Sequence, residues 1–521
     1  MKKTNLKAKL ILYIYMSIYF IINLFTLTRF PFVHSDEPWL AGLSRGYSVN
    51  HTPFITESFF DLFPRNPHMI KVLYHYTQAL FIKIFGYNIF SVRLISLVAA
   101  MITIYLFYLI FNKMLKNTWY VILLTILTSL NIQFIYGSHF ARQEIILLMF
   151  LVGCYYIYRF SDLNLTKKVV IIGIIIGISI GFHPNSFIIG LVFGMIMFVD
   201  FIKKDIRFKP LLLCGIIIVS FATFFVGLSF VGDNNFINNY MTYGATLNVD
   251  ASLIDKLFSL DNFYIKLFNQ IGGTYYLPNI KIILIGIVIA AMGSLVAIIL
   301  FKNKIELKSY LVLSDAIISL IAINIGLVSI GRYNATSIIF IMPFGYFILA
   351  VSIKHIKKRA VIITTLLTGM ILFSLVGDYK EISMYTPYDY DKYLLSIEEN
   401  LPNNSVVLGN LSSGFLFEEG TFYDIRNLAF LKDNNITLED YIRNNNINTI
   451  IYYEEIDYIH RNEDWQILYG NDNYYYDDLN QFIDTNCYLV GGFSDAVYGM
   501  RIVRYMHDYP WEIKIYKIKA H

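Results

Sequence analysis

Long apolar stretches separated by short polar connections run through the chain up to residue 377. Because a helix needs roughly 20 largely apolar residues to cross a bilayer, this pattern predicts a polytopic α-helical membrane protein with about eleven transmembrane helices. The predicted spans are residues 8–28, 89–112, 117–137, 141–160, 168–183, 184–202, 210–231, 278–301, 309–330, 334–353 and 360–377. Residues 69–86 are less uniformly apolar and predict an amphipathic helix at the membrane surface.

The chain changes character near Gly377. Residues 405–409, 448–453, 487–491 and 511–518 are rich in β-branched and aromatic side chains, which is typical of strands. Thr437 and Asp440 have the spacing of a helix N-cap and its third residue. We therefore expect two domains, a transmembrane domain over residues 1–377 and a soluble α/β domain over residues 378–521.

Composition agrees with this division. Only 15% of the residues are charged and 56% are hydrophobic, whereas a soluble globular protein carries about 25% charge. The net charge of +4 combines +17 over residues 1–377 with −13 over residues 378–521. So small a net charge gives no reason to expect a nucleic-acid partner. Cys154, Cys214 and Cys487 are too scattered for a disulfide framework.

The distribution of lysine and arginine predicts the topology. Alternate connections are basic, beginning with the N-terminus, and basic loops remain in the cytoplasm. The N-terminus is therefore expected in the cytoplasm of a multi-pass cell-membrane protein, and the C-terminal domain outside the cytoplasm. Most of the polar side chains that could take part in catalysis or binding then lie on the outer face.

Asp36 and Glu37 follow the first predicted span directly. Adjacent carboxylates in low-dielectric surroundings raise each other's proton affinity. One of them could then act as a general base toward a hydroxyl group while the other positions it. The alternative is a pair of solvated loop carboxylates at the membrane boundary.

Arg142 and Glu144 begin the fourth predicted span. On a helix, residues two positions apart point to nearly opposite sides, so we expect these two side chains to meet different partners rather than each other. Arg142 is also readable as an interfacial anchor, whereas an acid inside a span is costly and indicates function. Arg332 lies at the outer end of the tenth span. His68, His75, His139 and His183 do not have a metal-ligand spacing, so a zinc site is not expected.

The stretch Asp36-Glu37-Pro38-Trp39-Leu40-Ala41-Gly42-Leu43-Ser44-Arg45 resembles the D-E-x-x-x-A-x-x-S-R pattern in the first outer loop of GT-C fold glycosyltransferases. The similar branch contains the dolichyl-phosphate-mannose protein mannosyltransferases and the aminoarabinose lipid A transferases. The order of the downstream motifs is also similar: Asn66-Pro67-His68, Tyr74-His75-Tyr76, Phe85-Gly86, Arg93-Leu94 and Arg142-Gln143-Glu144. The chain departs from the pattern in having Glu144 in place of Asp and His68 in place of Lys.

The resemblance implies a GT-C-like fold and transfer of a sugar from a polyprenyl-phosphate donor to an acceptor on the extracytoplasmic face. The acceptor could be a lipid, a protein or a glycan. Inverting displacement would use Asp36 as general base, with Glu37 orienting it or binding the acceptor, and Glu144 pairing with a cation or contacting the sugar. The candidates for binding the donor phosphate are Arg142, Arg332, His68 and His139. No cofactor is required, although a divalent metal could assist.

Two alternatives come from other functional classes. A transporter or flippase of lipid-linked sugars would place paired charges at mid-membrane and show an internal repeat. The chain has no evident repeat, and its polar residues gather at one face. A non-catalytic membrane receptor would use the outer domain to bind a partner, and Asp36 would then be incidental.

Overall fold

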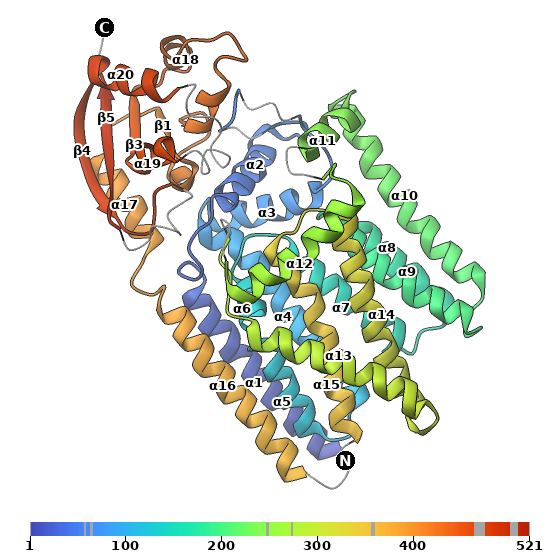
Figure 1. The fold of residues 1–521 in the computed structure, drawn as a ribbon. Helices are drawn as coiled ribbons and strands as arrows, with labels where there is room; N and C mark the ends of the chain where they lie inside the picture. Colours follow the sequence, from blue (N-terminus) through green and yellow to red (C-terminus); the bar gives the residue numbers. More distant parts are fainter. Residues whose placement is uncertain are drawn as a thin grey trace. The chain divides into compact units, whose positions relative to one another are not determined.

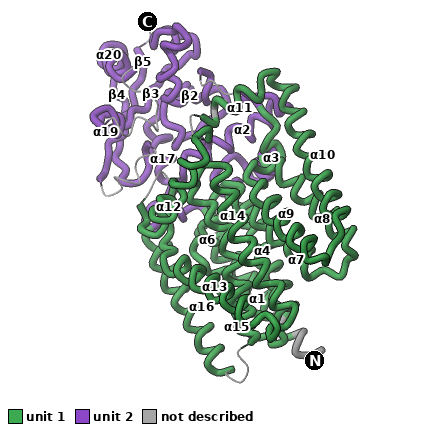
Figure 2. Tube along the Cα trace, turned by 45° about the vertical axis from the view of Figure 1, so that its right-hand side comes forward, with its two compact units in different colours: residues 1–27, 68–74, 93–384 green, residues 28–67, 75–92, 385–521 purple. Residues whose placement is uncertain are grey.

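The computed structural model describes residues 2–56, 59–62, 66–245, 249–271, 275–355, 360–462, 475–500 and 509–519. The chain forms two compact units (Figure 2). The first unit contains residues 1–27, 68–74 and 93–384, and the second contains residues 28–67, 75–92 and 385–521. The second unit therefore combines the region around Asp36 with the C-terminal part of the chain.

Every secondary-structure element described in the first unit is a helix. Its helices are α1 (Lys2–Thr26), the greater part of α4 (Ile89–Met114), α5 (Thr118–Ser129), α6 (Ile132–Ser138), α7 (Glu144–Phe160), α8 (Leu165–Ile180), α9 (Ser186–Ile202), α10 (Phe208–Gly232), α11 (Phe236–Ala245), α12 (Leu253–Asn269), α13 (Lys281–Phe301), η1 (Lys302–Lys304), α14 (Leu307–Ile330), η2 (Ala335–Ile341), α15 (Met342–His355) and α16 (Ala360–Ser383). A helix occupies each of the predicted spans. The polytopic helical fold is thus confirmed.

The presence of a helix in each predicted span does not by itself give the number of complete membrane crossings. Within the described residues, seven helices are long and apolar enough to cross a membrane, or eight if α5 and α6 form one span. These two helices are bent by 64° where they meet. Asn131 begins α6 there, and its side chain accepts a hydrogen bond from the backbone N–H of Gln133 at 2.9 Å. The count of eleven stays a prediction.

Burial divides these helices into two kinds. Only 11% of the apolar window of α10 and 17% of that of α13 is buried, and α1 and α16 resemble them. In contrast, 67% is buried in α4 and 78% in the span formed by η2 and α15. Exposed Leu, Ile and Phe side chains on the first kind suit contact with lipid, while the second kind forms the interior of the first unit.

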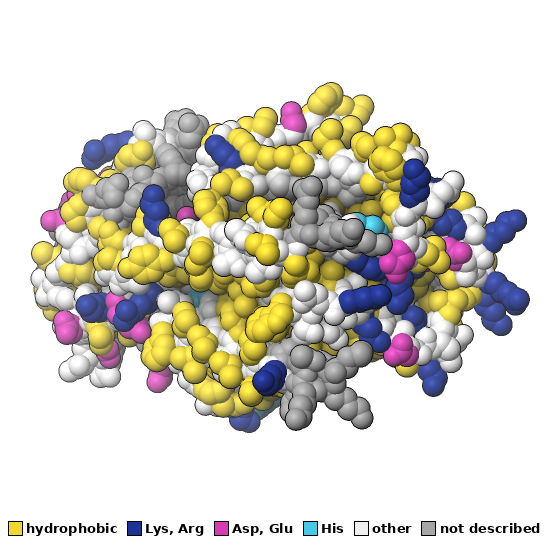
Figure 3. All heavy atoms as spheres, turned by 90° about the horizontal axis from the view of Figure 1, so that it is seen from below, with side chains coloured by type: hydrophobic (Ala, Val, Ile, Leu, Met, Phe, Trp, Pro, Cys, Tyr) yellow, Lys and Arg dark blue, Asp and Glu magenta, His cyan; other side chains and the backbone are white. Residues whose placement is uncertain are grey.

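The turns between α9 and α10 and between α13 and α14 carry exposed basic side chains, including Lys203, Arg207, Lys302 and Lys304. These turns lie at the lower end of the helices in Figure 1. Figure 3 shows this face from below. Its surface is largely apolar, and lysine and arginine side chains cover more of the remainder than acidic side chains do. The clustering agrees with the basic connections that the sequence places on one side of the membrane.

The second unit contains a five-stranded sheet in the order β2-β1-β3-β5-β4 (Figure 1). Its strands are β1 (Val407–Gly409), β2 (Phe422–Asp424), β3 (Thr449–Tyr453), β4 (Cys487–Asp495) and β5 (Trp511–Ile518). The first three are parallel, and β5 pairs antiparallel with both β3 and β4, for example Ile450 with Tyr516. The four predicted strands are confirmed, whereas the three-residue β2 was missed.

The helical elements of the second unit are α2 (Asp36–Asn50), most of α3 (Val72–Phe85), α17 (Tyr390–Asn400), η3 (Leu411–Leu416), η4 (Ile425–Phe430), α18 (Leu438–Asn444), α19 (Glu455–Arg461) and α20 (Tyr476–Asn486). Thr437 caps α18 as predicted, because its hydroxyl accepts the backbone N–H of Asp440 at 3.1 Å. The first outer segment was expected as a loop. In the structure α2 begins at Asp36 itself.

Candidate functional site

Asp36 and Glu37 occupy the first turn of α2, where the helix dipole favours negative charge. The Glu37 side chain is fully buried, and its Oε2 accepts a hydrogen bond from the backbone N–H of His34 at 2.9 Å. Glu37 therefore ties His34, which precedes the helix, to the first turn of α2. This bond fixes the direction in which the chain enters the helix beside Asp36.

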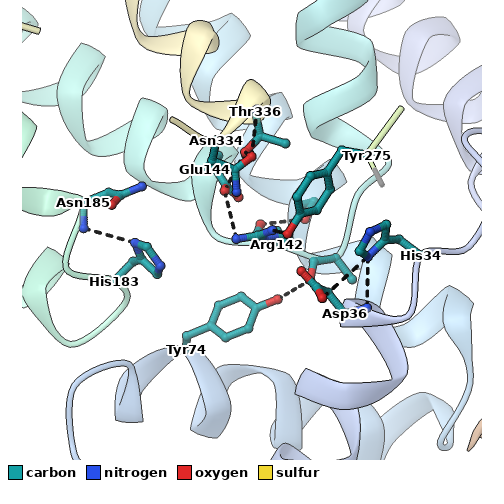
Figure 4. Close-up of polar contacts among 12 residues, drawn as sticks. His34, Asp36, Tyr74, Arg142, Glu144, His183, Asn185, Tyr275, Asn334 and Thr336 are labelled. Carbon is teal, nitrogen blue, oxygen red and sulfur yellow. Dashed lines mark hydrogen bonds and ion pairs between the residues drawn. The ribbon is translucent and has the colours of Figure 1, made fainter. Parts of the chain in front are cut away.

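His34 also holds Asp36 (Figure 4). The backbone N–H of Asp36 donates to His34 Nδ1 at 3.0 Å, and Asp36 Oδ1 lies 3.6 Å from the same nitrogen. Because Nδ1 accepts a hydrogen bond, it carries no proton in this arrangement, and the imidazole does not form an ion pair with Asp36 through that nitrogen. The Asp36 side chain is 14% exposed, which leaves it accessible to an acceptor.

In the first unit, Arg142 and Glu144 lie side by side. Arg142 Nη2 is 3.5 Å from Glu144 Oε1, and both side chains are buried. The prediction that they meet different partners is therefore wrong. Helical geometry does not apply to Arg142, because α7 begins at Glu144 and Arg142 belongs to the irregular segment before it. Apolar patterning alone could not locate that helix start.

Glu144 is held from a distant part of the chain (Figure 4). Its Oε1 accepts the Thr336 hydroxyl at 2.7 Å, and that hydroxyl also lies 2.8 Å from Asn334 Oδ1. Asn334 in turn caps η2 by accepting the Thr336 backbone N–H at 3.1 Å. Glu144 Oε2 is buried and has no hydrogen-bond partner among the described residues. The carboxylate thus has remaining capacity to accept a hydrogen bond from a ligand.

Tyr275 also contacts Arg142. Arg142 Nη1 donates to the Tyr275 hydroxyl, and the guanidinium carbon lies 5.1 Å from the centroid of the Tyr275 ring. Tyr275, Asn334 and Thr336 were not predicted as site residues. The sequence signal for them is weak, since each is one polar or aromatic residue in a short segment beside a span.

The segment that carries Arg142 is held by its backbone. The Tyr74 hydroxyl donates to the Ala141 carbonyl at 2.6 Å, and the Ser96 hydroxyl donates to the Phe140 carbonyl at 2.7 Å. Arg142 N–H donates to the Phe140 carbonyl at 2.7 Å. These bonds satisfy backbone groups of an irregular segment and fix its conformation.

His183 lies near four basic residues of the first unit. It lies in the turn between α8 and α9, and its Nδ1 accepts the backbone N–H of Asn185 at 3.0 Å. Burial lowers the pKa of His183 well below its usual value, and the positive charges of Lys71, Arg142, Arg332 and His68 lower it further. His183 is therefore neutral at pH 7, with basic groups around it. Arg332 is exposed.

His139 is not part of this cationic group. It is fully buried, with Nε2 2.9 Å from the Thr26 hydroxyl and Nδ1 2.9 Å from the Ile135 carbonyl. Burial lowers the pKa of His139 to about 4, so the ring supplies no positive charge at pH 7. We therefore interpret His139 as a packing residue that joins α1 to the end of α6, and its contact with the donor phosphate stays a prediction.

No group of three or more His, Cys, Asp or Glu side chains within the described ranges is arranged to hold a metal ion. In the first unit, the Arg142 guanidinium offers paired donors that suit an anion, beside the Glu144 carboxylate. In the second unit, Asp36 offers a carboxylate at a helix N-terminus.

Comparison with known proteins places the fold. A family model described as dolichyl-phosphate-mannose-protein mannosyltransferase matches residues 69–226. No curated protein sequence matches the chain. The structure of ArnT from Cupriavidus metallidurans bound to undecaprenyl phosphate is similar with a TM-score of 0.65, 11% identity and 98% coverage of both chains.

Two structures from Archaeoglobus fulgidus are also similar. One is an oligosaccharyltransferase in the apo form, and the other is the oligosaccharyltransferase AglB with an inhibitory peptide and a dolichol-phosphate. In both cases the TM-score is 0.50 and the identity 12%, with 92% of this chain and 73% of the other covered. The chain thus has the GT-C fold that the motif beginning at Asp36 predicted.

Proposed function

We propose that this protein is a membrane glycosyltransferase that moves a sugar from a polyprenyl-phosphate donor to an acceptor hydroxyl. The observation that carries the proposal is the buried array of Arg142, Glu144 and Thr336 in a GT-C fold. The similar proteins also support it, since the ArnT structure is bound to undecaprenyl phosphate and the AglB structure to a dolichol-phosphate. The sugar and the acceptor class, whether lipid, protein or glycan, are left to experiment.

In the proposed reaction, the acceptor oxygen attacks the anomeric carbon as the bond to the donor phosphate breaks. Asp36 takes the acceptor proton, and the electron pair of the broken bond leaves on the polyprenyl phosphate. The transition state is oxocarbenium-like, and one displacement inverts the anomeric centre. Glu37 keeps Asp36 in position through its hydrogen bond to the backbone N–H of His34.

Negative charge grows on the leaving phosphate, so donors placed before the reaction lower the barrier. We assign this role to Arg142, assisted by Arg332 and His68. Arg142 is the principal candidate because a guanidinium binds phosphate oxygens in pairs and Tyr275 and Glu144 restrict its rotation. Glu144 is a positioning residue for Arg142 whose Oε2 is available to the sugar.

The topology and the domain roles belong to the same proposal. We place the N-terminus in the cytoplasm and residues 378–521 outside, with transfer on the outer face of the cell membrane. Cys154, Cys214 and Cys487 are buried, so we expect little labelling of the native thiols. A membrane-impermeant maleimide on intact cells should label N403C and spare K304C. The reverse pattern would overturn this orientation.

The activity is tested in purified membranes with a panel of polyprenyl-phosphate sugars. We expect transfer by the wild type and a loss of about 10²–10⁴ in D36N, the range that a general base supplies. D433N, an exposed change in the second unit, is the matched control. Turnover of D36N at the wild-type rate would sink the base assignment. Mass spectrometry of the lipid that copurifies identifies the donor, and bound lipid without any transfer would favour a carrier.

A further inference from the structure

Helix α2 is buried along most of its length, although it carries polar side chains. Its residues Glu37–Pro38 and Leu40–Tyr47 are buried, including Ser44 and Arg45. In water a helix of 15 residues is marginally stable by itself. The position of α2, and therefore of Asp36 at its start, must come from the elements of the second unit that pack against it.

The first turn of α2 contacts the segment from η3 to η4. A Cβ atom on Gly414 of η3 would lie 3.5 Å from Pro38 Cβ, which is ordinary van der Waals contact. The Arg426 guanidinium carbon lies 5.5 Å from the Trp39 ring centroid and 4.6 Å from that of Phe60. The residues next to Asp36 and Glu37 are thus packed against the C-terminal part of the chain.

The buried carboxylate of Asp424 orients the Arg426 side chain. Asp424 is fully buried, and its Oδ1 accepts Arg426 Nε–H at 3.1 Å. Its Oδ2 accepts the backbone N–H of Leu411 at 2.8 Å. A charge-assisted pair of this kind fixes the plane of the guanidinium. Trp39 therefore meets a rigid cation rather than a mobile one.

The second half of α2 has its own anchor. Arg45 Nη1 donates to the Phe417 carbonyl at 2.6 Å, and its guanidinium carbon lies 3.9 Å from the Tyr87 ring centroid. The Arg45 side chain is 8% exposed. One turn further on, Asn50 Nδ2 donates to Glu419 Oε1 at 3.1 Å. Phe417 and Glu419 thus hold the C-terminal half of α2.

Ser44 and Arg45 are adjacent, and consecutive helical residues are rotated by about 100°. The Ser44 hydroxyl accordingly contacts α3, with His75 Nδ1 at 2.9 Å and Gln78 Oε1 at 2.6 Å. Arg45 instead contacts the chain after η3. The pair at the end of the D-E-x-x-x-A-x-x-S-R stretch therefore ties α2 to two different elements.

We propose that residues 411–426 of the α/β domain form a platform that positions α2, and that Arg45 and Arg426 act through it on Asp36. This inference rests on the proposed function, because it gives the platform a role in proton transfer. A displacement of about 1 Å in a catalytic group costs up to roughly a hundredfold in rate. Arg45 and Arg426 are positioning residues, since they touch the helix and the platform rather than the substrate.

The kinetic test compares R45A and R426A with R443A. Arg443 is 76% exposed and pairs only with Asp440 of its own helix among the contacts described for it, so it is a matched loss of one arginine from the same domain. We expect kcat to fall about tenfold to a hundredfold in R45A and R426A, with KM for the donor within twofold of the wild type. R443A should behave as the wild type. An unchanged kcat in both test variants would overturn the proposal.

Tyr87 provides a milder matched pair. Its hydroxyl is buried and has no hydrogen-bond partner among the described residues, whereas its ring stacks on Arg45. Y87F keeps the stacking ring and should retain full kcat, whereas Y87L removes the ring and should lower kcat in the direction of R45A. Equal rates for Y87F and Y87L would contradict the role of Arg45.

Two further measurements separate a failure of this inference from a failure of the proposed function. Hydrogen exchange needs no activity: R45A should speed exchange of α2 amides while β3 and β5 stay protected, and unchanged α2 exchange would overturn the platform. In the double variant D36N/R45A, the Arg45 change should add no further loss of rate, because it acts through Asp36. Additive losses would contradict that route, whereas full activity of D36N alone would overturn the proposed base.

Discussion

An arginine lies at each end of α7, just before its start and in its last turn, and the two have very different settings. At its C-terminal end, Arg159 Nε and Nη2 bond Asp315 at 2.6 Å and 2.7 Å, and Nη1 lies 2.8 Å from Asp200. Tyr158 donates to Asp200 at 2.6 Å, and Tyr155 donates to Asp315 at 3.3 Å. The three charged groups come from α7, α9 and α14, so the cluster ties these helices together.

At the N-terminal end, the buried carboxylate of Glu144 is less fully bonded. Its Oε1 lies 3.5 Å from Arg142 Nη2, and its Oε2 has no hydrogen-bond partner in the described part of the chain. Arg142 lies outside the helix, whereas Arg159 lies within its last turn. The two ends therefore differ in how far the protein itself satisfies its buried carboxylates.

This difference separates stability from function. Buried ionic groups that are fully hydrogen-bonded lock a fold together, while groups with spare capacity are placed to bind something else. We interpret the Arg159 cluster as structural and the Arg142 array as a ligand site.

The largest effect is expected for R159M. Removing the guanidinium leaves two buried carboxylates from α9 and α14 without their cation, which costs about 3–5 kcal/mol. The melting temperature and yield of the detergent-solubilised protein should drop together with activity. K113M, which removes a pair between Lys113 and the 94% exposed Asp162, should change little. A stable R159M would refute the structural role, and D200N/D315N should partly rescue it.

For R142A we expect the opposite balance. Loss of the cation that we propose to bind the leaving phosphate should reduce transfer about 10²–10³-fold, comparable to removing one transition-state donor elsewhere. The melting temperature should stay within a few degrees of the wild type. R142K should recover little, because an ammonium group does not reproduce the paired donors. Equal losses of stability and rate would place Arg142 with Arg159 instead.

Glu455 extends the comparison to a carboxyl group without a cation. It is fully buried in the second unit, and its Oε1 accepts the Met500 N–H at 3.1 Å. Burial raises the pKa of Glu455 to about 8, with smaller contributions from the charges of Asp495 and Glu454. The folded state therefore binds more protons than the unfolded state between roughly pH 4.5 and pH 8, and stability falls as the pH rises through that window.

E455Q should remove this dependence. The amide retains an oxygen for the Met500 N–H but does not ionise, so the variant should gain about 2–4 kcal/mol over the wild type at pH 8.5 and little at pH 5. Denaturation of the full-length protein at both pH values measures the difference. E399Q, at an exposed position, is the control. The same pH slope in E455Q and wild type would refute the assignment.

The smallest effect concerns Thr336. T336V keeps the shape but removes the hydroxyl that donates to Glu144, which is worth about 1 kcal/mol or roughly fivefold in rate. T336S should restore the wild-type rate because it retains the donor. Both variants are compared by initial rates at saturating donor. If T336V and T336S transfer equally well, Thr336 does not position Glu144.

The sequence predicted the elements whose signal is local. Each predicted span contains a helix, because a long apolar run in a bilayer can satisfy its backbone only within itself. The strand at residues 511–518 has the predicted bounds, since its alternating β-branched and aromatic residues are characteristic. The motif beginning at Asp36 indicated the GT-C fold that the structural comparison supports.

Other features had no local signal. β2 has three residues, too few for a pattern, and it exists because β1 offers it a parallel edge. The pairing of Arg142 with Glu144 depends on a helix start that apolar residues on both sides obscure. Thr336 reaches Glu144 across 192 positions in the chain, and periodicity carries no information about such a contact.

What the sequence determined by itself is therefore the apolar helices that fill most of the chain before its C-terminal part, the strands of that C-terminal part and the candidate base at Asp36, since each follows from composition, spacing or a short motif. Tertiary structure alone decided that Asp36 opens a helix, that α2 packs in one unit with the C-terminal strands, and that Arg142 meets Glu144. The physical reason is the distance along the chain over which each kind of information acts. Hydrophobic periodicity reports on neighbours within a turn or two, whereas buried charges are satisfied by whichever distant groups the packing brings to them.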